Sequence, residues 1–219
     1  MAFSFSMNVH LQQVLPDYFE ENKKSTSEIW GKDIVFQKGA YVKIVAPSGS
    51  GKTSLIHFLY GLRNQHKGLI AYDDHDVKRK SKEEIADYRA RSISIVFQDL
   101  KLFSEQTVWE NIDIKRQLNP HHPSEKIKEM CERLGIGDKL SSKTKICSYG
   151  EQQRIAIIRS LMQPFDILLL DEPFSHLDNA NAEKAMALIV EEAKERGATI
   201  VFADLERVDF FPYSQLYHL

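Results

Sequence analysis

The amino-acid sequence predicts an α/β protein with a largely parallel sheet, an antiparallel β part and an inserted helical lobe. Short runs rich in β-branched residues alternate with helical patterns, which is typical of this class. The run 167–170 is continuously apolar, as expected for a strand that is buried on both faces. From about 98 to 164 we find no good strand pattern and several helical ones, which predicts the inserted lobe.

The predicted elements of the core follow one another in chain order. Strands are expected at 41–46, 68–72, 93–97, 167–170 and 199–202, with 68–72 at an edge or in a hairpin. Helices are expected at 53–60 and 181–196, the second from the spacing of Ala185, Leu188, Ile189 and Ala193. We expect a single domain over 1–219, with the core at 1–97 and 165–219 and the lobe at 98–164.

One helix of the lobe can be placed from its end signals. Ser124 is suited to cap its first turn, and Gly135 would end it. Its apolar face would consist of Ile127, Met130, Cys131 and Leu134.

Composition and charge describe a soluble globular protein. The 219 residues are 42% hydrophobic and 27% charged, with a formal net charge of -2. Because no dense run of lysine or arginine occurs, no nucleic-acid partner is expected. The longest apolar runs, 155–158 and 167–170, are far shorter than the ~20 residues that span a bilayer. The first residues do not resemble a secretion signal. We therefore expect a cytoplasmic protein, attached to the membrane only through a partner.

The sequence contains two cysteines, Cys131 and Cys147, far apart in the chain. We interpret them as buried or idle thiols rather than as redox or metal-binding groups. This usage fits a reducing cytosol.

A phosphate-binding loop is predicted at 46–53, which reads A-P-S-G-S-G-K-T between a strand and a helix. Gly49 and Gly51 allow a tight turn that points backbone N–H groups inward. Lys52 can reach the β- and γ-phosphates of ATP, and the Thr53 hydroxyl can hold Mg²⁺. The expected contacts to the nucleotide from this segment are Ser48, Gly49, Ser50, Gly51, Lys52, Thr53 and Ser54. Ala46 replaces the usual first glycine, which is a mild departure. We therefore expect a P-loop NTPase core of the RecA-like type.

Two acids follow the apolar run 167–170, in the order I-L-L-L-D-E-P. They would lie at the carboxyl end of a buried parallel strand, where ligands bind. Asp171 can hold Mg²⁺, and Glu172 can orient or deprotonate the attacking water.

Residues 147–154 read C-S-Y-G-E-Q-Q-R, which resembles the signature motif of ABC ATPases, L-S-G-G-Q or L-S-G-G-E followed by Gln-Gln-Arg. Cys147 replaces the leucine and Tyr149 the first glycine. The resemblance implies that Ser148, Gly150 and Glu151 form a second anion cradle at a helix N-terminus. In the family this cradle faces the γ-phosphate bound by the other subunit of a dimer.

Three further segments resemble the same family in the same order. Gln98, in I-V-F-Q-D, resembles the Q-loop glutamine, a ligand of Mg²⁺ and water. The stretch T-V-W-E-N-I at 107–112 is similar to the lipoprotein-releasing, cell-division and macrolide-export branch. S-H-L-D at 175–178 resembles the D-loop, whose Asp178 would reach across the dimer. The resemblance spans about 34–206. It also implies an aromatic contact to adenine, for which Tyr18 is the first candidate and Phe19 the second.

The family's switch histidine has no counterpart in this sequence. The equivalent stretch, T-I-V-F-A-D-L-E at 199–206, places Ala203 or Asp204 at that position. His176 lies at a variable position of the D-loop, and we interpret it as solvent-facing or interfacial rather than as a replacement. Losing one transition-state contact costs on the order of 10²–10³ in rate.

The resemblance implies the ATP-binding and ATP-hydrolysing subunit of a membrane transporter, with Glu172, Gln98 and Lys52 as catalytic residues. The nucleotide would be ATP with Mg²⁺ on Thr53, Gln98 and Asp171. The partners would be a membrane-spanning subunit and a second ATPase subunit, in a homodimer or a heterodimer. An alternative is a nucleotide-sensing module with little hydrolysis. A third, an ABC ATPase acting on DNA or ribosomes, is disfavoured by the short lobe and the single cassette.

Overall fold

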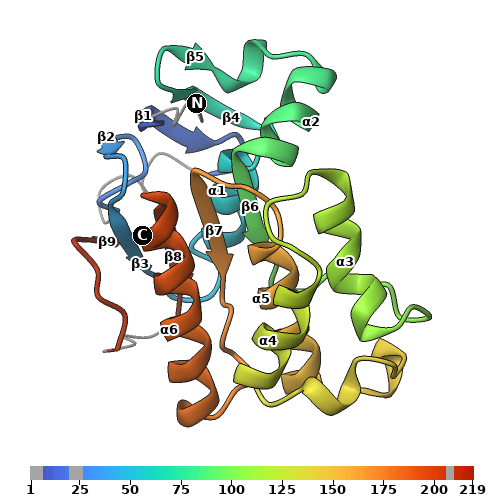
Figure 1. Cartoon of the computed structure of the whole chain (residues 1–219). Helices are drawn as coiled ribbons and strands as arrows, with labels where there is room; N and C mark the ends of the chain where they lie inside the picture. Colours follow the sequence, from blue (N-terminus) through green and yellow to red (C-terminus); the bar gives the residue numbers. More distant parts are fainter. Residues whose placement is uncertain (1–6, 20–26, 206–209) are drawn as a thin grey trace.

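The computed structural model describes residues 7–19, 27–205 and 210–219, and its centre is a parallel sheet (Figure 1). The strands lie in the order β6 (Ile93–Val96), β7 (Ile167–Asp171), β8 (Thr199–Asp204), β3 (Tyr41–Val45) and β9 (Gln215–His218). Each neighbouring pair is parallel. β7 has a strand on both sides and is buried along its whole length, as its apolar sequence predicted.

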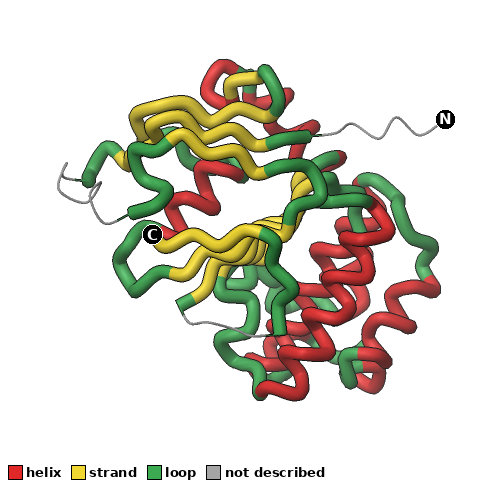
Figure 2. The backbone as a smooth tube through the Cα atoms, turned by 90° about the vertical axis from the view of Figure 1, so that its left-hand side faces the viewer, coloured by secondary structure: helices red, strands yellow, loops and turns green. Residues whose placement is uncertain are grey.

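A second, antiparallel sheet packs above the first. Its order is β2 (Asp33–Phe36), β1 (Val9–Pro16), β4 (His66–Tyr72) and β5 (His75–Asp76). Helix α1 (Lys52–Leu59) lies between the two sheets (Figure 2), and buried apolar residues of both sheets and of α1 form one core. The prediction that 68–72 forms a hairpin is confirmed by the β4–β5 pairing, but β4 is not an edge strand because β1 lies on its other side.

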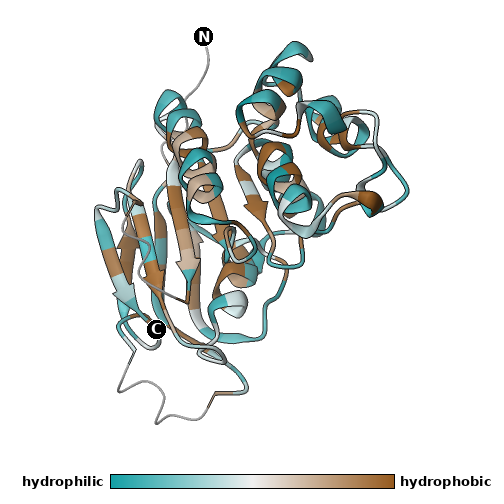
Figure 3. Ribbon diagram, turned by 90° about the horizontal axis from the view of Figure 1, so that it is seen from below, coloured by the Kyte–Doolittle hydropathy of each residue, from teal (hydrophilic) through white to brown (hydrophobic). Residues whose placement is uncertain are grey.

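Helices cover the opposite face of the parallel sheet. Between β6 and β7 the chain forms α3 (Val108–Leu118), α4 (Glu125–Arg133) and α5 (Tyr149–Leu161), with 3-10 turns at Gly137–Lys139 and Thr144–Ile146. Helix α6 (Asn179–Arg196) joins β7 to β8. Their buried apolar residues form a second core with the strands, in which α3 and α4 pack against α5 (Figure 3).

Helix α4 has the predicted face and the predicted end. Ile127, Met130, Cys131 and Leu134 are all buried. Gly135 follows the helix with φ of 67°, a conformation that glycine adopts without strain. The expected cap is wrong in one respect, because Ser124 holds the cap position in a helical conformation and its side chain makes no capping hydrogen bond.

Several elements were not predicted from the sequence. β2 and β9 are four residues long and β1 depends on pairing with distant strands, so local patterns gave too little signal. Helix α2 (Lys82–Arg91), which follows the 3-10 turn Val77–Arg79, buries none of its residues and so lacks an apolar stripe.

Both cysteines are free and buried, in agreement with their interpretation as idle thiols. Burial raises the pKa of Cys131 to about 12 and also raises that of Cys147. Both thiols therefore stay protonated and unreactive at neutral pH. Among the described residues, no helix is both long and apolar enough to cross a bilayer.

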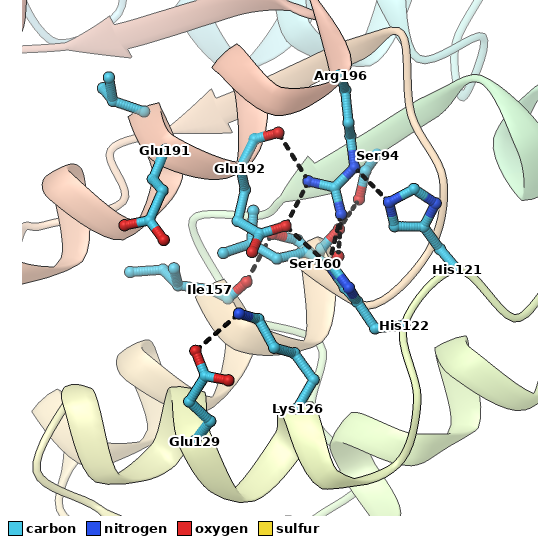
Figure 4. Close-up of polar contacts among 12 residues, drawn as sticks. Ser94, His121, His122, Lys126, Glu129, Ile157, Ser160, Glu191, Glu192 and Arg196 are labelled. Carbon is cyan, nitrogen blue, oxygen red and sulfur yellow. Dashed lines mark hydrogen bonds and ion pairs between the residues drawn. The ribbon is translucent and has the colours of Figure 1, made fainter.

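A polar network joins the loop after α3 to the last turn of α6 (Figure 4). The Arg196 guanidinium donates to His121 Nε2 at 3.1 Å and pairs with Glu192 Oε2 at 2.7 Å. His122 Nε2 lies 2.7 Å from the same carboxylate oxygen. Burial alone would raise the pKa of Glu192, but His122 and Arg196 lower it overall, so this fully buried carboxylate remains charged. The network fastens the helical region to α6.

Lowering the pH from about 7.5 to about 4.5 should destabilise the protein through His121. Burial and the Arg196 charge lower the pKa of this imidazole from 6.5 to about 4. Between these values the unfolded chain binds the proton more readily, so the stabilisation is present above pH 6.5 and is lost as the pH falls toward 4. Urea unfolding should show a smaller pH dependence for His121→Gln than for wild type or for the exposed control His75→Gln. An unchanged pH dependence in His121→Gln would contradict this expectation.

Candidate active site

The predicted phosphate loop connects β3 to α1 as a tight turn. Gly49 and Gly51 have φ of 78° and 95°, values that residues with a Cβ rarely adopt. The Lys52 ammonium curls back over the loop and donates to the carbonyl oxygens of Ala46 at 2.8 Å and Pro47 at 3.3 Å. Lys52 and Ser54 are buried, while Ser48 is exposed. The loop is therefore held in a curled form around the lysine.

Aromatic residues from the N-terminal region support this loop. Trp30, which is buried, donates from Nε1 to the Ser50 carbonyl oxygen at 3.0 Å. A Cβ on Gly51 would lie 2.9 Å from Phe19 Cζ and 3.1 Å from Trp30 Cζ2, so only glycine fits there. Trp30 was not found by sequence reasoning, because no motif marks it and its distance from the loop is set by the tertiary fold.

The predicted catalytic residues meet at the carboxyl edge of the parallel sheet. Lys52 Nζ lies 3.3 Å from Glu172 Oε1. Gln98, which follows β6, donates from Nε2 to Glu172 Oε2 at 3.1 Å. Its other amide atom, Oε1, accepts from the Thr53 hydroxyl at 3.5 Å. The structure thus brings a phosphate-reaching cation, a carboxylate and two polar groups to one point.

Glu172 adopts a backbone conformation that is uncommon for a residue with a side chain. Its φ is 48°, and left-handed non-glycine residues cost on the order of 1 kcal/mol. Three hydrogen bonds hold its backbone: its N–H donates to Ala203 O at 2.9 Å, and its carbonyl oxygen accepts from Gln153 Nε2 at 3.3 Å and from the Ser175 N–H at 3.4 Å. This conformation directs the side chain toward Lys52 and Gln98.

Asp171 provides a buried negative charge suited to a metal ion. The residue is 1% exposed, and within the described chain neither carboxylate oxygen has a hydrogen-bond partner. Burial raises its pKa from 3.8 to about 6, the Glu172 charge adds to the increase, and the Thr53 hydroxyl and Lys52 oppose it. A divalent cation would satisfy both oxygens, so the residues present fit Mg²⁺ held by Asp171, Thr53 and Gln98.

The turn after Gln98 is strained and is held by an arginine that sequence reasoning missed. Leu100 and Lys101 have φ of 58° and 48°. The Arg159 guanidinium, on α5, donates to both carbonyl oxygens, at 2.5 Å and 2.7 Å. Burial lowers the pKa of Arg159 to about 10, so it stays charged at neutral pH. The one sign of Arg159 in the sequence is that a charged residue interrupts the apolar pattern of that helix.

The signature segment forms the first turn of α5. The Glu151 N–H donates to Ser148 Oγ at 3.3 Å, and the Ser148 N–H donates to Glu151 Oε2 at 2.7 Å. This capping box lowers the pKa of Glu151, mainly through the hydrogen bond from the Ser148 backbone. A Cβ on Gly150 would lie 3.0 Å from the His176 carbonyl oxygen, so the signature and D-loop backbones are in close approach.

The D-loop residue Asp178 caps α6, accepting from the Asn181 N–H at 2.8 Å. That hydrogen bond is the main reason that the pKa of Asp178 is lowered. Among the described residues, no hydrogen bond or ion pair connects Ser148, Glu151 or Asp178 to the phosphate loop. One copy of the chain therefore assembles two separate groups. We call them the catalytic edge (Lys52, Gln98 and Glu172) and the signature surface (the first turn of α5 and the segment 175–178).

Tyr18 and Asp204 flank the phosphate loop. Tyr18 is 60% exposed, and its hydroxyl lies 2.5 Å from Ser54 Oγ, so an uncovered ring lies at the start of α1. Phe19 instead packs edge-on against Trp30, with ring centroids 5.8 Å apart. Asp204 ends β8, and its carbonyl oxygen accepts from the Ala46 N–H at 3.2 Å. No histidine lies in the described part of this strand end; Glu206 is outside the described residues.

Fold and site together define a P-loop nucleotide-binding protein. The family model described as "ABC transporter" matches residues 32–175. The chain is 36% identical over 181 residues to the lipoprotein-releasing system ATP-binding protein LolD of Aquifex aeolicus (strain VF5), covering 81% of this chain and 80% of that protein. It is 32% identical over 190 residues to the cell division ATP-binding protein FtsE of Streptococcus pneumoniae serotype 2, covering 85% and 82%.

Solved structures agree with these relatives. A bacterial ABC transporter cassette in a dimeric structure matches with a TM-score of 0.76 at 26% identity, covering 90% of this chain and 88% of that one. A dimeric post-hydrolysis state of an ATP-binding cassette with ADP and Pi matches with a TM-score of 0.78 at 25% identity and the same coverage. The chain therefore belongs to the ABC transporter family, as one of its ATP-binding cassettes. The predicted fold class and family branch are confirmed.

Asp171→Asn should stabilise the nucleotide-free protein above about pH 6. Because the folded pKa of about 6 exceeds 3.8, the folded state favours the protonated acid, and this stability is lost as the pH rises through 6. Asparagine carries no charge to desolvate, so the variant should gain up to about 3 kcal/mol near pH 8 and nothing near pH 4. Urea unfolding without Mg²⁺ measures this, with the exposed Asp74→Asn as control. A variant no more stable than wild type near pH 8 would show the charge to be well tolerated.

Proposed function

We propose that this chain hydrolyses ATP to power a membrane transporter. The observation that carries the proposal is the convergence of Lys52, Gln98 and Glu172 at the carboxyl edge of the sheet. This edge is the ligand-binding side of parallel α/β sheets. The protein would lie at the cytoplasmic face of the membrane, held there by its partner.

The chain's own residues divide the work of the reaction. Backbone N–H groups of the loop 46–53 and the start of α1 bind the phosphates, and Lys52 neutralises their charge. Tyr18 offers its exposed ring to the adenine. Thr53, Gln98 and Asp171 would hold Mg²⁺, which neutralises charge that develops on the phosphate oxygens. Glu172, held beside Gln98, orients and deprotonates the attacking water.

A head-to-tail dimer would complete each site. The anion cradle at Ser148 and Gly150 lies apart from the phosphate loop within one copy, so it is available to the nucleotide of a second ATPase subunit. One similar cassette of known structure was described as a dimer in two states. Both a homodimer and a heterodimer satisfy this geometry.

Replacing Glu172 by glutamine should abolish hydrolysis while leaving an ATP-bound dimer. The amide keeps the side chain's shape and can still accept from Gln98, but it cannot take a proton from water. Phosphate release should fall on the order of 10²-fold or more, and size-exclusion chromatography with ATP should show a stable dimer. Hydrolysis at the wild-type rate would show that Glu172 is not the base.

A second candidate is a nucleotide-sensing module with weak hydrolysis. It is favoured by Asp204, because a carboxylate at the end of β8 cannot donate a hydrogen bond to a phosphate and would repel it. The wild-type rate in the same assay, measured with the membrane partner present, separates the two candidates. Robust phosphate release excludes the sensing module.

The partner surface that we propose lies on α3. A groove of about 420 Å³ is lined by Phe103, Gln106, Trp109, Glu110, Asp113, Ile114 and Gln117. Phe103 and Ile114 are 52% and 41% exposed, and Leu118 nearby is 71% exposed. Large exposed apolar side chains of this kind mark protein interfaces. Its occupant would be a cytoplasmic segment of the membrane-spanning subunit.

Ile114→Glu should weaken co-purification with the membrane subunit by at least tenfold, because a charge would be buried in an apolar contact. ATP binding by the isolated cassette should be unchanged, since Ile114 lies outside the nucleotide site. Leu62→Glu, which changes a similarly exposed leucine shortly after α1, serves as the control. If Ile114→Glu retains the partner as well as the control does, the groove is not the docking surface.

A further inference from the structure

We propose that His176 of one copy donates a hydrogen bond to the γ-phosphate of the ATP held by the second copy, a catalytic role that rests on the dimeric ATPase proposed above. The imidazole would supply the donor that Asp204 cannot supply within each copy, so His176 would be the replacement that the sequence alone disfavoured.

His176 lies on the signature surface. Its ring centroid is 4.1 Å from that of Tyr149, which lies between Ser148 and Gly150 at the start of α5. Both side chains are exposed, Tyr149 to 45%. The Tyr149 ring, which replaces a glycine of the motif, therefore packs against the His176 imidazole. Through Tyr149, His176 lies next to Ser148 and Gly150, the anion cradle that would face the other copy's nucleotide.

The hydrogen-bond network fixes the backbone of His176 relative to the catalytic edge. Gln153 Oε1 accepts from the His176 N–H at 3.0 Å, and Gln153 Nε2 donates to the Glu172 carbonyl oxygen at 3.3 Å. Because one backbone donor and one backbone acceptor hold it, the Gln153 amide can have only this orientation. The D-loop and the general base are thus joined through a single buried side chain.

Ser175 lies against one of the two imidazole nitrogens. Its Oγ accepts from Gln153 Nε2 at 3.4 Å and lies 2.9 Å from His176 Nδ1, to which the serine O–H donates in one of the two neutral tautomers. An imidazole that accepts at Nδ1 carries its proton on Nε2. Within the described chain no hydrogen bond to Nε2 is found, and the ring is exposed. In this tautomer Nε2–H is a donor available to an acceptor outside this copy.

No side chain at the described end of β8 supplies such a donor. β8 ends beside β3, with Asp204 opposite Val45 at the start of the phosphate loop. A carboxylate accepts but does not donate hydrogen bonds, and it adds negative charge next to bound phosphates. An imidazole brought in by the second copy can donate to the phosphate, which the Asp204 carboxylate cannot do.

The first test compares His176→Ala with wild type and with His75→Ala, which removes an exposed histidine from β5. Phosphate release at saturating ATP should fall on the order of 10²-fold in His176→Ala. ATP affinity of the single copy and melting temperature should not change, because the side chain serves only the other copy's site. A rate within twofold of wild type overturns the proposal. Absence of hydrolysis in the wild-type protein would instead contradict the ATPase function itself.

The second test uses dimers of two differently tagged copies. In the first dimer Lys52→Ala and His176→Ala are on the same copy. The one phosphate loop with an intact Lys52 then faces a copy without His176, so this dimer should not release phosphate. In the second dimer they are on different copies, so the intact loop meets an intact His176 and should release phosphate at about half the wild-type rate. Equal rates in the two dimers, or the reverse order, overturn the assignment across the interface.

Discussion

The candidate site depends on the register of three adjacent parallel strands. Val45 lies opposite Asp204 and Asp171 lies opposite Ala203, so the phosphate loop and the acidic end of β7 emerge at the same edge. This register brings the cation and the carboxylate of the site, which come from α1 and from the end of β7, to 3.3 Å. A slip of one residue in either pairing would separate them and reverse the faces of β8.

Several residues at this edge have a burial or a backbone conformation that destabilises the folded state, and the rest of the fold holds them in place. Asp171 is charged and buried without a partner, and Glu172, Leu100 and Lys101 have left-handed backbone conformations. Such features cost free energy that nearby ligand binding can recover. Two apolar cores, one on each face of the parallel sheet, supply the stability that tolerates them.

Helix α5 links the parts of the site that lie apart in the chain. Its first turn is the signature segment, Gln153 holds both Glu172 and the D-loop, and Arg159 holds the turn after Gln98. A displacement of this helix would therefore reach Glu172, the proposed general base, and the turn after Gln98 together. The helix also packs against α3, which carries the proposed partner groove, so α5 connects that groove with the candidate nucleotide site.

The sequence by itself determined the features that depend on short spacing: the phosphate loop, the acidic end of β7, the capped start of α5 and the apolar face of α4. Each of these requires particular residue types within a few positions, because the backbone is locally constrained. Only the tertiary structure decided the pairing of β1 and β2, the support of the loop by Trp30 and the packing of Tyr149 on His176. These contacts join distant segments, and local periodicity carries no information about which surfaces meet.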